Sequence, residues 1–123
     1  MPGSPDGPEL ARLLAAALAE ERSGGDALDV VDERADVTPT ADGTVAYAVA
    51  DGGARLAEVA VQPDRVHLAV RAAPEAAARA AATAELRVRP KAVRPPQTLV
   101  FVESAAEVNR AADVLDAVRA ERG

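Results

Sequence analysis

Residues 44–71, TVAYAVADGGARLAEVAVQPDRVHLAVR, constrain the fold of this chain more than any other stretch. Large aliphatic residues alternate with small or polar ones, which is the period-two pattern of strands with one buried face. Two turn signals divide the stretch, DGG at 51–53 and QPDR at 62–65. Glycine reaches positive φ without steric cost, and proline presets the second position of a turn. We therefore predict three antiparallel strands joined by two tight turns.

The register of these strands follows from which residues share a face, because directly opposite residues of an antiparallel pair lie on the same side. The predicted pairs are Val61–Val66, Val59–Leu68 and Ala57–Val70 in the second hairpin, and Asp51–Arg55, Val49–Ala57, Tyr47–Val59 and Val45–Val61 in the first. This register places Tyr47, Val59 and Leu68 in one row on the core face. A slip of one residue would turn that whole row to the other face.

The opposite face of the same strands is predicted to be rich in alanine. By the same pairing it carries Ala46, Ala48, Ala50, Leu56, Glu58, Ala60, His67, Ala69 and Arg71. Two interpretations remain open: the alanine reflects the composition of the whole chain, or it forms a flat contact surface for a partner or a second copy. The candidate interaction face consists of Ala46, Ala48, Leu56, Glu58, Ala60, His67 and Arg71.

Three helices flank the strands. The first is predicted from Pro8 to Arg22, with Asp6 and Glu9 spaced as a capping box and SGG at 23–25 as the stop. The second begins at Pro74, a favoured first helical position. The third runs from Ala105 to Arg122, with its buried stripe formed by Val108, Ala111, Ala112, Leu115 and Val118. Residues 1–7 are predicted to be a disordered tail and residues 8–123 one domain.

Further strands are predicted outside the central stretch. Residues 97–103 carry apolar side chains on both faces, which indicates a position inside the sheet. Residues 85–89 alternate, and the loop at 90–96 holds three prolines. The acidic stretch 26–43 is either a short edge strand or a loop. The fold class is therefore α+β: an antiparallel meander of about five to six strands, with the N-terminal, middle and C-terminal helices packed mainly on one face.

Several classes of chemistry find no support in the residues. The chain has no cysteine and a single histidine, His67, which indicates neither a thiol nucleophile nor a zinc–thiolate site. The acids of 26–43 lack the spacing of a calcium-binding loop, and no glycine-rich phosphate loop opens a helix. We expect a protein that is not an enzyme and needs no metal or cofactor.

Charge is divided unevenly along the chain. Residues 1–64 hold thirteen acids and four bases, a net charge of −9, whereas residues 65–123 hold seven acids and ten bases, a net charge of +3. Such asymmetry can orient an association between molecules. Arg87, Arg89, Lys91 and Arg94 form a candidate anion patch. We do not expect nucleic-acid binding, because the chain is acidic overall and its two aromatic residues, Tyr47 and Phe101, are predicted in the core.

The order of elements from Leu10 to Arg122, the small size and the pI of about 4.8 resemble the chaperone-like α+β domains of bacteria, including class I type III secretion chaperones. The stretch DVVDERADVTPTADGTVAYAVA and the final VFVES before the last helix also look like small bacterial domains of unknown function. The resemblance implies a homodimer that binds another polypeptide without catalysis. Since no apolar run reaches membrane-spanning length and the first residues lack a signal-peptide pattern, we expect a cytoplasmic protein without membrane contact.

The function predicted from the sequence is therefore that of a non-enzymatic interaction or chaperone-like module, acting as an acidic homodimer that binds another protein. The alternative is a small-molecule-binding or enzyme-accessory domain. It would have a pocket between sheet and helices near Tyr47, with Glu58, His67 and Arg71 or the basic run supplying polar contacts.

Overall fold

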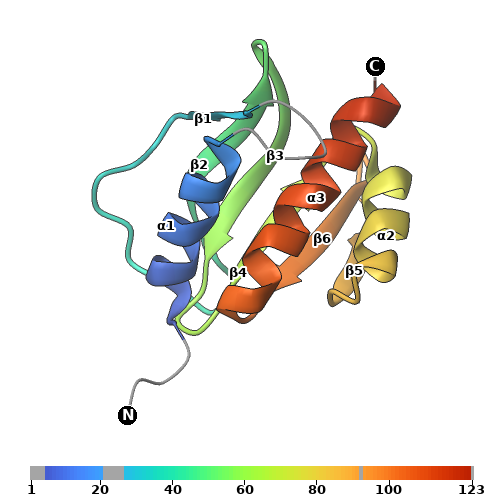
Figure 1. Cartoon of the computed structure of the whole chain (residues 1–123). Coiled ribbons are helices and arrows are strands. Elements are labelled where there is room, and N and C mark those ends of the chain that lie inside the picture. The colour runs from blue at the N-terminus through green and yellow to red at the C-terminus, as the bar shows by residue number, and fades with distance from the viewer. Residues whose placement is uncertain (1–4, 21–26, 92, 123) are drawn as a thin grey trace.

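A computed structural model describes residues 5–20, 27–91 and 93–122 of the chain (Figure 1). These residues form the helices α1 (Gly7–Leu18), α2 (Pro74–Thr83) and α3 (Ala105–Arg122). The strands are β1 (Asp29–Val31), β2 (Thr44–Asp51), β3 (Ala54–Val61), β4 (Val66–Val70), β5 (Val88–Lys91) and β6 (Gln97–Val102). All three helices cover the same face of the sheet, which confirms the predicted α+β class (Figure 1).

The sheet has six antiparallel strands in the order β1-β2-β3-β4-β6-β5. The first four strands follow the predicted meander, but the last two are exchanged, because α2 carries the chain to the far edge before β6 returns beside β4. The composition of each strand fits its position in this order. β6 is apolar on both faces and lies inside, whereas β5 contains Pro90, which is tolerated at an edge. Asp29–Val31 forms a short edge strand, and the remainder of the acidic stretch that the structure describes lies outside any strand.

The predicted register is correct throughout the second hairpin and partly wrong in the first. Val59 lies opposite Leu68, and Tyr47 lies opposite Val59, so the predicted core row is confirmed. Asp51 pairs with Ala54 rather than Arg55, and Val45 pairs with Ala60 rather than Val61. The reason is two β-bulges, each of which inserts one extra residue into one strand of a pair.

The first helix begins one residue before the prediction and ends at Leu18, short of the predicted Arg22. The Asp6 side chain accepts a hydrogen bond from the Glu9 backbone N–H at 2.9 Å, as a helix cap should. The predicted stop at 23–25 and residues 1–4 of the predicted tail lie outside the described residues. Gly7, which was assigned to the tail, is buried: a Cβ there would lie 1.7 Å from the backbone oxygen of Gln62.

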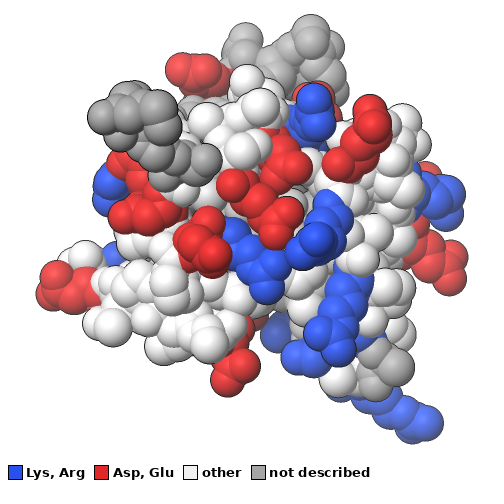
Figure 2. Space-filling model, turned by 90° about the horizontal axis from the view of Figure 1, so that it is seen from below, with Lys and Arg blue, Asp and Glu red and all other residues white. Residues whose placement is uncertain are grey.

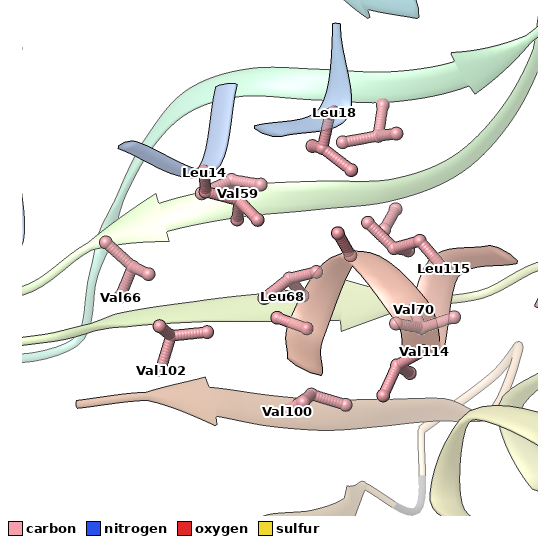
Figure 3. Packing of buried hydrophobic residues seen from close by; sticks show 14 of the residues in the cluster. Leu14, Leu18, Val59, Val66, Leu68, Val70, Val100, Val102, Val114 and Leu115 are labelled. Carbon is pink, nitrogen blue, oxygen red and sulfur yellow. The ribbon is translucent and has the colours of Figure 1, made fainter. Parts of the chain in front are cut away.

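The hydrophobic core lies between the sheet and the helices. Figure 3 shows side chains from α1, α3 and the central strands pointing toward one another. Leu14, Leu68 and Leu115 are fully buried there, as are the valines of the inward-facing positions. Tyr47 ties β2 to α1, because its hydroxyl donates a buried hydrogen bond to the Ala11 carbonyl oxygen at 2.7 Å. Burial, followed by the negative charge of Glu33, raises the pKa of Tyr47, so the hydroxyl stays protonated and donates.

Candidate functional site

The face of the sheet that no helix covers is called the open face. Its side chains are identified from the pairing: each row of directly opposite residues shares one side. The open face comprises Asp29, Val31, Val45, Ala48, Ala50, Arg55, Glu58, Ala60, His67, Ala69, Arg89, Lys91, Gln97, Leu99 and Phe101. Arg71 follows β4 and lies beside it, since its guanidinium contacts Glu58.

Two residues of the predicted interaction face lie on the other side of the sheet. Ala46 and Leu56 belong to the buried cluster beneath the helices. Each is the extra residue at a bulge. Ala46 of β2 has no partner on β3, because its neighbours Val45 and Tyr47 pair with the consecutive residues Ala60 and Val59. Leu56 of β3 has no partner on β2, because its neighbours Arg55 and Ala57 pair with the consecutive residues Ala50 and Val49. A bulge re-aims the side chain at the insertion, so simple alternation assigns it to the wrong face.

The alanines of the open face are not bare. Ala48 is 1% exposed and Ala50 is 2% exposed, although no helix covers them. Long charged side chains lie on this side of the sheet: Arg71 pairs with Glu58 at 3.3 Å, and Arg55 pairs with Asp32 of the loop after β1. Alanine leaves room for the stems of such side chains, which cover apolar surface while their charges stay in water. The surface offered to a partner is therefore largely charged.

One corner of the open face is an ordered polar cluster around His67. The His67 ring contacts the Phe101 ring, with centroids 5.7 Å apart, and its Nδ1 lies 3.2 Å from the Gln62 side-chain oxygen. Gln62 Nε2 donates to the Ala41 carbonyl oxygen at 2.7 Å, which leaves its oxygen to accept from His67. Gly43 packs against the ring, and with φ of +97° and a Cβ that would lie 2.7 Å from the ring, only glycine fits.

The pKa of His67 is lowered, first by burial and then by the positive charges of Arg65 and Lys91. The Arg65 guanidinium lies 4.6 Å above the centre of the Phe101 ring and pairs with Glu103 at 3.1 Å. Phe101 was predicted in the core. It is buried, but on the open face, under a guanidinium rather than under a helix. Gln62, Arg65 and Glu103 could not be assigned to this cluster beforehand, because only the pairing of β3, β4 and β6 brings them together.

The four residues of the predicted anion patch have different environments. Arg87 pairs with Glu103 at 3.5 Å. Arg89, Lys91 and Arg94 make no ion pair with any residue in the described part of the chain. Arg89 and Lys91 lie in β5 and Arg94 lies in the loop after it, so all three cations are at one edge of the sheet. Figure 2 shows basic side chains filling the lower right of the view from below, on the β5 side of the molecule.

Several hollows lie on the surface, and two of them border segments that the sequence singled out. The first, of about 490 Å³, lies between α1, the loop after β1 and β2, and Tyr47 lines it together with Arg12, Glu33 and Arg34. A pocket near Tyr47 was predicted, but its polar residues are not the predicted ones: Glu58, His67 and Arg71 are not among its lining residues. The second hollow, of about 1000 Å³, lies between the start of α2 and the β5–β6 loop. No pattern in the sequence predicts this hollow, because its walls come from separate segments.

Within the described residues, no group of three His, Cys, Asp or Glu side chains could hold a metal ion. None of the described helices is long and apolar enough to cross a membrane. Residues 3–123 match the model of a family of unknown function, DUF7993, and the chain belongs to that family. No curated protein and no solved structure matches it.

Proposed function

We propose that this member of DUF7993 is a non-catalytic protein-binding module that acts as a homodimer, in which the open faces of two sheets meet. The observation that supports the dimer is the division of charge across the open face. The β1 edge carries Asp29 and is followed by the acidic loop, whereas the β5 edge carries Arg89 and Lys91, which make no ion pair with a described residue. Asp29 also makes no ion pair with a described residue.

Two-fold symmetry would make these edges complementary. In a dimer of this kind both copies use the same surface patch. An axis parallel to the strands, running between the two sheets beneath β3 and β4, places the β1 edge of each copy opposite the β5 edge of the other. Acidic side chains of one copy then face basic side chains of its partner at both ends of the interface, while the half-buried Ala69 near the axis leaves room for close approach.

The charged side chains of the open face determine which interactions would stabilise such a dimer. Because ion pairs cover its alanines, association brings charges together more than it removes apolar surface from water. Exposed ion pairs contribute only about 0–1 kcal/mol each and weaken with salt. The dimer should therefore be reversible and sensitive to ionic strength.

Light scattering coupled to size-exclusion chromatography at micromolar concentration tests this. We expect a dimer at about 0.05 M salt and a monomer at about 1 M salt, where the screening length falls to about 3 Å. Replacing Arg89 and Lys91 together by Glu should give a monomer at low salt. Adding Asp29→Arg to that variant should restore part of the dimer, because the reversed edges again attract.

Arg110→Glu is the matched control, because Arg110 is an exposed cation on α3, away from the open face. It should leave the dimer intact. A wild-type monomer at low salt, or a dimer that Arg110→Glu disrupts as strongly as the β5 reversal, would contradict the proposal.

The pocket beside Tyr47 favours a second candidate, a small-molecule-binding domain. Its volume of about 490 Å³ lies within the usual range of ligand sites. The loop between β1 and β2, residues 32–43, is far longer than a hairpin needs, and its residues 33–35 and 37 form one wall of the pocket. A thermal-shift screen of metabolites tests this candidate: a hit that Ala46→Leu abolishes supports it, and no hit argues against it.

A further inference from the structure

The larger hollow, which we call the α2–β5 groove, has apolar walls. It lies between the start of α2, strand β5, the β5–β6 loop and the end of α3. Its apolar lining residues are Ala73, Pro74, Ala76, Ala78, Pro90, Val93 and Pro96. Val93 is 37% exposed and is one of only two large hydrophobic residues that are exposed in the described part of the chain. An exposed valine at the wall of a hollow lined by alanine and proline offers a place for one apolar side chain.

The groove is held in shape before any partner arrives. The Thr98 hydroxyl donates to the Pro74 carbonyl oxygen at 2.6 Å, which fixes the start of α2 against β6. Proline rings in two of the walls restrict the backbone there. On the far side Arg79 of α2 lies 3.8 Å from Glu121 of α3, which links the two helices. A preformed site loses less entropy on binding than one that must be ordered.

The rim of the groove next to β5 is basic and uncompensated. Lys91 and Arg94 line it, and neither makes an ion pair with a described residue. Among the described residues of the lining, Arg79 is a third cation and faces Glu121, and Glu75 at the start of α2 is a second acid, on the side away from β5. An occupant that carries carboxylates beside an apolar group would therefore find partners for both.

The walls also indicate how the occupant is recognised. β5 is an edge strand of four residues, and one of them, Pro90, has no backbone N–H to offer. A polypeptide cannot add itself to this edge as a regular further strand. Side chains rather than backbone must supply the contacts, with an apolar residue in the groove and acidic residues at Lys91 and Arg94.

A nucleic acid fits these walls less well. Binding of single strands relies on aromatic side chains that stack on bases. The only aromatic residues of the chain are Tyr47 and Phe101, and both are buried elsewhere. The apolar lining would also remain unused by a phosphate backbone.

From this lining and this charge we infer that the α2–β5 groove binds an acidic peptide segment of a partner protein, with one apolar side chain held against Val93. This extends the proposed protein-binding function to a surface that meets the open face at Lys91 and Gln97. Val93 and Arg94 take no part in the proposed dimer, so each proposal can fail without the other.

Fluorescence polarisation with a labelled peptide of sequence EDLLDE tests the inference, with KKLLKK and EDSSDE as probes that reverse the charge and remove the apolar groups. We expect saturable binding of EDLLDE alone. Replacing Lys91 and Arg94 together by Glu should weaken that binding by about tenfold or more, and Val93→Asp should weaken it as well. Because these three side chains are exposed, the variants should keep the wild-type melting temperature, measured by circular dichroism.

Arg110→Glu is again the control and should bind as the wild type does. The measurement is repeated at about 1 M salt, where the proposed dimer dissociates, with enough peptide to compensate for screening. If EDLLDE still binds at this salt concentration and Val93→Asp still weakens the binding, the groove binds the peptide without the dimer. Equal affinity for EDLLDE and KKLLKK, loss of binding in Arg110→Glu, or tighter binding of a single-stranded RNA oligonucleotide than of EDLLDE would overturn the inference.

Discussion

The two faces of one sheet differ in how their side chains become buried. On the helix side the alternating positions of β3 and β4 hold Val59, Leu68 and Val70, which are fully buried because α1 and α3 pack over them. On the open face the neighbouring positions hold Ala60, which packs against Gly43 of the β1–β2 loop, and the half-buried Ala69. Large apolar residues therefore stabilise one face, whereas on the other small residues leave room for charged ones.

The largest difference should appear on removing a leucine from each face. Leu68→Ala removes a fully buried side chain on the helix side and should lower the free energy of unfolding by about 3 kcal/mol. Leu99→Ala, on the half-buried open face, should lower it by about 1 kcal/mol. Urea denaturation followed by circular dichroism measures both. Equal losses would mean that the open face carries a core of its own.

An intermediate effect is expected for the ion pair that covers the open face. Glu58 and Arg71 are 31% and 52% exposed, so solvent screens their interaction at 3.3 Å. A double-mutant cycle with alanine at both positions should give a coupling energy below about 1 kcal/mol. A coupling of several kcal/mol would show that this pair is desolvated, as it would be inside a tight dimer.

The smallest effect should be a change in how stability depends on pH. Because the pKa of His67 is lower in the folded protein than its unfolded value near 6.5, the unfolded chain binds more protons below that pH. The contribution of His67 is then fully present above pH 6.5 and is lost as pH falls through the lowered pKa. His67→Gln should flatten this part of the stability curve between about pH 5 and 7. An unchanged slope would show that His67 is not the group responsible.

The fold was largely predictable because its strongest signals are local. Alternation and two turns set the order and register of β3 and β4, and the spacing of Val108, Leu115 and Val118 set α3. The bulge at Ala46 was not predictable, because alanine fits either face and leaves no trace in the pattern, whereas Leu56, a leucine among the alanines of the predicted outer face, was a signal of the second bulge. The exchange of β5 and β6 depends on where α2 crosses, which no local residue determines.

The candidate surfaces were predictable only in part. Most residues of the open face could be assigned from the register. The ion pairs on that face could not, because Arg55 pairs with Asp32 and Arg65 with Glu103, which are far apart in the sequence. The α2–β5 groove joins the residues around Pro74 to those around Val93 and to Glu121. Such a hollow exists only once three separate segments have been placed.

The claim that the open faces of two copies meet is tested most directly by cross-linking a single cysteine. The chain has no cysteine, so Ala69→Cys places one thiol in the middle of the open face and Ala82→Cys places one on exposed α2. Packed sheets lie about 10 Å apart, within reach of a short bismaleimide. We predict a covalent dimer at low salt from Ala69→Cys, and little from Ala82→Cys or at about 1 M salt. Equal cross-linking of the two variants, or none from Ala69→Cys, would contradict the account.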